Sequence, residues 1–139
     1  MKNKTTTIEY DKWEQSTTVI SDRDKAVIVL LSDDIRRMFK GREYSEKCDV
    51  IPEHLFEYRF DFLKPDADPN DYGDDEVVTY IFKKLKSSNC WHLDRYDEAK
   101  ENKVGNIQFH NLTIYEGCNF ILHDIKELLG AETDNSNDR

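Results

Sequence analysis

Apolar and polar residues alternate along residues 55–62, and this alternation predicts the clearest secondary-structure element of the chain. A period of two is typical of a β-strand that buries one face and exposes the other to water. The apolar side consists of Phe56, Tyr58, Phe60 and Phe62, and the polar side consists of Glu57, Arg59 and Asp61.

Four further segments show a preference for β-structure. Residues 5–10 and 17–20 are rich in threonine and branched apolar residues, which predicts two short strands in a hairpin arrangement. Residues 26–31 read AVIVLL, and this unbroken apolar run predicts a central strand covered on both faces. Residues 91–96, WHLDRY, predict another strand.

The segment 107–115 is also strand-like, but its apolar phase changes along its length. Phe109 and Leu112 are three positions apart, so they cannot share one face of a regular strand. A β-bulge or tight bend near His110 and Asn111 would account for the shift.

Three segments have the spacing of amphipathic helices. The first begins at Ser32, which suits the N-cap position, and ends near Gly41, which suits a helix end. The second covers residues 75–87. The third covers residues 117–129 and is stopped by Gly130.

The order of these elements predicts the fold class. Residues 42–53 are expected to form a loop, and helices lie between strands along the chain. We therefore expect a single α+β domain over residues 1–130, with a mixed or mainly antiparallel sheet and about three helices packed on it. Residues 131–139 are polar and acidic and are expected to form a disordered tail.

Composition indicates a folded chain and a location in the cell. Aromatic residues make up 12% of the 139 residues, which is typical of a chain that folds around a core. The three cysteines are irregularly spaced, which favours buried, reduced thiols over a disulfide framework. No N-terminal signal segment and no apolar run of about 20 residues is seen, so we expect a cytoplasmic protein without membrane association.

The charge is large and unevenly distributed. The formal net charge is −9. Residues 1–64 carry 12 basic and 13 acidic residues, whereas residues 65–139 carry 8 and 16. A field of this sign repels phosphate groups, so direct binding of nucleic acid or anionic lipid is disfavoured.

Residues 65–76 concentrate this charge, with six carboxylates and no basic residue. Neither register tested for a calcium-binding EF-hand loop fits, because the required glycine and final glutamate never fall in place together. The last three acids suit the start of the following helix. The first three have no such local role, so they indicate either a cationic partner or a solvated loop.

A second acidic group covers residues 94–101 and contains Asp94, Asp97, Glu98 and Glu101. Each of the two groups contains a tyrosine, and aromatic residues among carboxylates are typical of surfaces that bind basic proteins. The predicted partner-binding residues are Asp66, Asp68, Asp71, Tyr72, Asp74, Asp94, Tyr96, Asp97 and Glu98.

One cluster of bases has no acid within it. It could bind a phosphate or nucleotide, although cations near a helix end also complement the helix dipole. The candidate anion-binding residues are Arg36, Arg37, Lys40 and Arg42.

Catalytic and metal-binding patterns are weak. Each cysteine has a histidine nearby in sequence, but none of these pairs has the spacing and ligand number of a zinc site. No nucleophile elbow, phosphate-binding loop or metalloprotease motif is present. We therefore expect no enzymatic activity, no catalytic residues, no metal and no cofactor.

These expectations favour a binding protein that neutralises a basic protein partner. The most specific form of this hypothesis is an immunity or inhibitor protein that blocks the cationic active site of a nuclease toxin, which must be positive where phosphates bind. One alternative is a phage-type anti-defence or regulatory protein that mimics nucleic-acid charge or sequesters a nucleotide. Another is a small enzyme that uses its histidines and cysteines.

Overall fold

The computed structural model describes residues 10–51, 55–65, 67–97 and 106–130. It forms one five-stranded antiparallel sheet in which every strand pairs with its neighbour along the chain. The strands are β1 (Tyr44–Ile51), β2 (Leu55–Leu63), β3 (Val77–Leu85), β4 (Trp91–Asp97) and β5 (Ile107–Leu112). The helices are α1 (Tyr10–Gln15), α2 (Asp22–Met38) and α3 (Ile114–Gly130), with short 3-10 turns η1 (Ser16–Thr18) and η2 (Asp74–Glu76).

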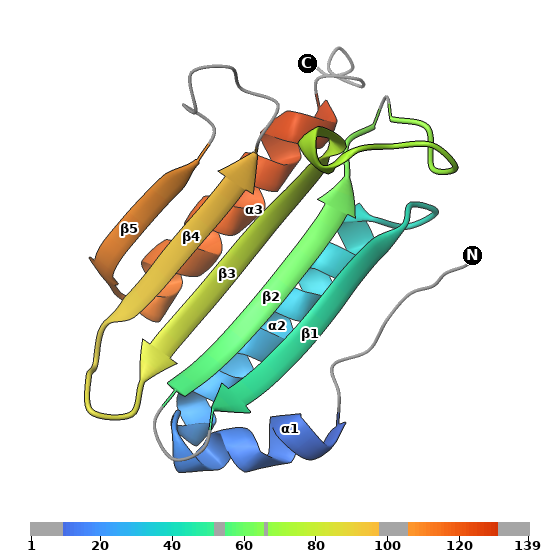
Figure 1. The fold of residues 1–139 in the computed structure, drawn as a ribbon. Coiled ribbons are helices and arrows are strands. Elements are labelled where there is room, and N and C mark those ends of the chain that lie inside the picture. The colour runs from blue at the N-terminus through green and yellow to red at the C-terminus, as the bar shows by residue number, and fades with distance from the viewer. Residues whose placement is uncertain (1–9, 52–54, 66, 98–105, 131–139) are drawn as a thin grey trace.

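The helices α2 and α3 cover one face of the sheet, and α1 lies across the end of the sheet near β1 (Figure 1). Side chains that point toward α2 and α3 form the core. On β2 these are the four aromatic residues predicted to share a face, and each is at most 2% exposed. The expected α+β fold is therefore confirmed.

Three local sequence predictions are confirmed. The strand over 55–62 is β2, and the strand over 91–96 is β4. The predicted bulge is present. Phe109 pairs with Leu93 and Leu112 pairs with Trp91, so β5 has one more residue than β4 between these two pairs. Asn111 accommodates it with a positive φ of 60°.

The helix predicted over 117–129 is also confirmed. It begins earlier, at Ile114, so the end of the strand predicted over 107–115 is wrong and β5 stops at Leu112. Thr113 and Glu116 account for this start. The Thr113 hydroxyl accepts from the Glu116 amide at 3.0 Å, and the Thr113 amide donates to the Glu116 carboxylate at 2.8 Å. This reciprocal capping box satisfies two amides at the helix start.

The apolar run 26–31 is not a strand, because it lies within α2. The N-cap is Ser21 rather than Ser32, and the Ser21 hydroxyl accepts from the Asp24 amide at 3.1 Å. Ile28, Leu31 and Ile35 recur at helical spacing and are buried. An unbroken apolar run fits either a buried strand or a helix, and here the buried residues at helical spacing favour the helix.

Two more predictions are wrong. The helix expected over 75–87 is the turn η2 followed by β3, and the loop expected over 42–53 contains β1. Both strands border β2, whose two edges supply their hydrogen-bonding partners. Pairing to a preformed neighbour can override the weak local preference of a segment.

The strand expected over 17–20 is also wrong, because η1 and a turn occupy it. Within the other expected N-terminal strand, residues 5–9 lie outside the described residues and Tyr10 belongs to α1. The expected tail, residues 131–139, likewise lies outside the described residues.

Candidate functional site

The face of the sheet opposite α2 and α3 carries a polar hollow of about 400 Å³. In the described part of the chain, no helix packs over this face (Figure 1). Because side chains alternate along strands, the residues that point away from the helices on β2, β3 and β4 meet there. The lining residues are Arg59, Asp61, Asp74, Val77, Thr79, Ile81 and Tyr96.

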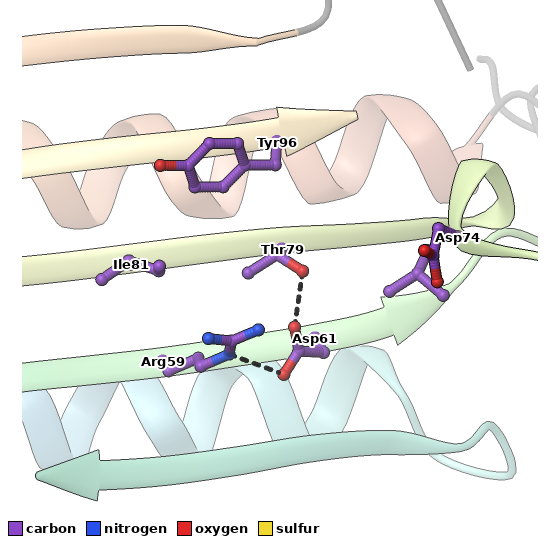
Figure 2. Close-up of a pocket in the computed structure, with 7 residues that line it drawn as sticks. Arg59, Asp61, Asp74, Thr79, Ile81 and Tyr96 are labelled. Carbon is purple, nitrogen blue, oxygen red and sulfur yellow. Dashed lines mark hydrogen bonds and ion pairs between the residues drawn. The ribbon is translucent and has the colours of Figure 1, made fainter. Parts of the chain in front are cut away.

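The floor of the hollow is fixed by hydrogen bonds to one carboxylate, that of Asp61 (Figure 2). The Thr79 hydroxyl donates to Asp61 Oδ1 at 2.5 Å, and Arg59 Nε donates to Asp61 Oδ2 at 3.3 Å. Thr79 is almost fully buried, whereas about half of the Arg59 side chain is exposed. Arg59 and Asp61 together therefore present a dipole whose positive end reaches solvent.

Tyr96 and Asp74 form two sides of the same hollow. Tyr96 is 36% exposed, and Figure 2 shows its ring lying along β4 on the open side. Asp74 is exposed and comes from η2, immediately before β3. The structure thus brings together two of the predicted partner-binding residues from distant parts of the chain.

The acidic loop that joins β2 to β3 borders this hollow. Asp68, Asp71 and Tyr72 are exposed in it. Asp68 organises the turn, because its carboxylate accepts from the Asn70 amide at 2.9 Å and its carbonyl accepts from the Asp71 amide at 3.0 Å. Tyr72 is 53% exposed and lines an adjoining hollow that also includes Asp61.

Two predicted binding residues do not present carboxylates at the surface. Asp97 is fully buried on the helix-covered face, with Oδ1 at 2.6 Å from Lys64 Nζ. Asp94 points to the open face but is only 3% exposed, with Oδ2 at 3.1 Å from Lys83 Nζ. Strand parity explains the difference between Asp97 and exposed Tyr96. Asp66 and Glu98 lie outside the described residues.

The candidate anion-binding residues do not converge on one site. Arg36 Nη1 is 2.8 Å from Asp33 Oδ1, and Arg37 pairs with Asp34. Arg37 lines a groove between α2 and α3, whereas Arg42 lines a separate hollow beside the acidic loop. Lys40 is exposed beyond the end of α2.

Sequence reasoning missed Arg59, Asp61, Thr79 and Ile81 as site residues. The polar side of the 55–62 strand was a signal for the first two, since an exposed strand face can bind a partner. Thr79 and Ile81 were assigned to a helix, and only the pairing of β2 with β3 places Thr79 beside Asp61.

The described histidines and cysteines do not line this hollow. His92 and His110 are neighbours, with their Nδ1 atoms 3.0 Å apart, and a hollow beside them includes Cys90. Burial and the charge of His110 lower the pKa of His92, against an opposing effect of Asp94. His123 lies apart on α3.

The expectation of buried thiols is correct for Cys48 and Cys118 but wrong for Cys90, which is exposed. Burial raises the pKa of the Cys118 thiol to about 12. Among the described residues, no group of three or more histidine, cysteine, aspartate or glutamate side chains has the geometry of a metal site.

No protein-family model, curated protein or solved structure matches this chain. Within the described residues, none of the helices combines the length and apolar character needed to cross a lipid bilayer.

Proposed function

We propose that this protein binds and neutralises a basic protein, and that it does so without catalysis. The observation that carries this proposal is the joining of exposed Tyr96 and Asp74 in one hollow on the open sheet face, beside the loop that bears Asp68 and Asp71. Aromatic side chains supply binding energy when a partner desolvates them, and carboxylates steer a cationic partner toward them.

The architecture favours recognition by a rigid surface. The hollow sits on three paired strands, and its central carboxylate is already hydrogen-bonded to Thr79 and Arg59. A surface that is ordered before binding loses little conformational entropy when its partner arrives.

The partner that best fits this chemistry is a toxin that acts on nucleic acid. Such an enzyme must be positive where it binds phosphates, and the chain carries a formal net charge of −9. The exposed carboxylates of Asp68, Asp71 and Asp74 beside the hollow compete for that positive groove. This protein would then act as an immunity or inhibitor protein.

The test is affinity capture from the native cell with the full chain as bait. We expect one basic protein to be retained at low salt and released at high salt, and its nuclease activity to be blocked at one equivalent. Tyr96→Ala should reduce retention at least tenfold, whereas Tyr115→Ala, which removes a tyrosine that is 51% exposed on α3, should not. Capture of no basic protein, or equal retention by both variants, would contradict the proposal.

A further inference from the structure

The open sheet face carries a second constellation at its other end, near the start of β4. The bulge in β5 places His110 beside His92 on the neighbouring strand, with 3.0 Å between the two Nδ1 atoms. The ring centres are 4.1 Å apart and the rings are inclined by 74°. Bulges that re-aim a side chain are enriched next to functional sites.

A buried carboxylate stands behind this histidine pair. Asp94 is 3% exposed, and its Oδ1 lies 3.8 Å from Nε2 of His92, the ring nitrogen that faces away from His110. Oδ2 is occupied by Lys83 at 3.1 Å, but Oδ1 has no hydrogen-bonding partner among the described residues. A histidine that binds a metal commonly directs its other nitrogen toward such a carboxylate.

The spacing of the two nitrogens restricts which ion they can hold together. Bonds of about 2.0–2.1 Å from imidazole nitrogen to a metal, with 3.0 Å between the nitrogens, enclose an angle close to a right angle. Tetragonal and octahedral ions such as Cu²⁺ and Ni²⁺ accept that angle between adjacent ligands, whereas tetrahedral zinc prefers a wider one.

The surroundings leave room for the remaining ligands. A hollow of about 410 Å³ opens beside the pair and is also lined by Cys90, Ser88 and Asn111. Water or a donor from a bound molecule can fill the other positions. The site would therefore have two protein ligands, and its other coordination positions would be open. This agrees with the finding that no group of three or more potential metal ligands occurs among the described residues.

We propose that His92 and His110 chelate a divalent first-row transition ion of the Cu²⁺ and Ni²⁺ class through their Nδ1 atoms. The ion replaces the hydrogen bond between the two Nδ1 atoms, and the proton of that bond moves to the Nε2 atom of the donor histidine. Asp94 is a positioning residue whose carboxylate, 3.8 Å from Nε2 of His92, favours a proton on that nitrogen and leaves Nδ1 directed at the ion. This site is separate from the hollow around Tyr96 and does not depend on the proposed inhibitor function.

The test is calorimetric titration of the full chain with Ni²⁺ alone, which avoids the oxidation of thiols by Cu²⁺. We expect one equivalent to bind. His92→Gln and His110→Gln should each weaken binding at least tenfold, because each removes one of two ligands. His123→Gln is the matched control, since His123 is exposed on α3, and it should leave binding unchanged. No binding to the wild-type chain, or full binding to the double variant, would overturn the proposal.

The role of Asp94 has its own readout. Asp94→Asn should weaken Ni²⁺ binding about 10–100-fold, as expected for loss of a carboxylate behind a ligating histidine. Nitrogen chemical shifts of the metal-free His92 ring should move from a single Nε2–H tautomer toward a mixture. An unchanged tautomer would contradict the positioning role even if the variant bound less metal. Circular dichroism verifies that each variant is folded.

Discussion

The guanidinium of Arg95 on β4 holds the carboxylate of Asp124 on α3 through two hydrogen bonds, from Nε at 2.9 Å and from Nη2 at 3.2 Å. Tyr80 on β3 donates a third hydrogen bond to the same carboxylate at 2.6 Å. Both charged side chains are largely buried, with 9% and 16% of their surfaces exposed. A helix and two strands therefore meet at one buried polar contact on the helix-covered face of the sheet.

Removal of one partner of this pair should be costly. Asp124→Ala removes the carboxylate to which Arg95 and Tyr80 donate, and we expect the free energy of unfolding to fall by about 3–5 kcal/mol. Urea denaturation followed by circular dichroism measures the change. The double variant Arg95→Met/Asp124→Leu should be much less destabilised, because both charges of the pair are removed together. A double variant as unstable as Asp124→Ala would contradict this account.

Gly117 is predicted to be intolerant of any side chain. A Cβ atom built there would collide with the ring of Phe82, which is fully buried on β3. Gly117→Ala should therefore destabilise the fold by about 1–3 kcal/mol through overpacking. Gly130 is the matched control in the same helix, since a Cβ there meets no atom within 4 Å. Gly130→Ala should be neutral or stabilising by up to about 1 kcal/mol in the same urea titration.

The cysteines should differ in reactivity and in their effect on alkaline stability. Iodoacetamide at pH 8 should modify exposed Cys90 and spare buried Cys48 and Cys118, as read by mass spectrometry. Burial raises the pKa of Cys118 to about 12 from an ordinary value of 9.0. The unfolded chain therefore loses this proton first, and the stability contributed by Cys118 decreases as pH rises from about 9 toward 12.

A variant isolates this alkaline effect. Cys118→Ala should lower stability at pH 8 but make the decline between pH 9 and pH 10.5 shallower than in the wild-type chain. Cys90→Ser should leave the slope unchanged. Burial also raises the pKa of Tyr58 and of Tyr80, so part of the alkaline decline should persist in every cysteine variant.

The acidic loop should act mainly on the rate of association. Asp68→Asn/Asp71→Asn should slow binding of the basic partner and weaken its dependence on salt, because the steering field near the site is reduced. The control Glu14→Gln/Asp22→Asn removes the same charge from exposed positions on α1 and α2. Stopped-flow association rates over a range of ionic strengths measure both. Equal slopes for the two double variants would remove the loop from the interface.

The segments that were predicted correctly have an apolar pattern that fits only one type of secondary structure. Residues 55–62 alternate strictly, and only a strand places their aromatic residues on one face. The segment 77–85 contains apolar residues at both helical and strand spacing. Its pairing with β2 on one side and β4 on the other selects the strand, and this choice depends on residues far from the segment.

The candidate site was likewise predictable from the sequence only in part. The exposed acids of the β2–β3 loop were predictable, because charge density alone indicates them. The hollow was not, since it requires the register that sets Thr79 opposite Asp61 and Tyr96 opposite Thr79. The burial of Asp97 follows from strand parity, which becomes definite only once β4 is placed in the sheet.

The strand order of the sheet has a consequence for how the chain folds. Each strand pairs with the next along the sequence, so the sheet can grow by successive hairpins without closing a long loop. The contact of α2 with α3 instead joins elements from the two ends of the described chain. We expect this contact to form after the rate-limiting step, so that a substitution such as Leu122→Ala on α3 speeds unfolding more than it slows folding. The two helices would then dock last, on a sheet whose strands have already paired.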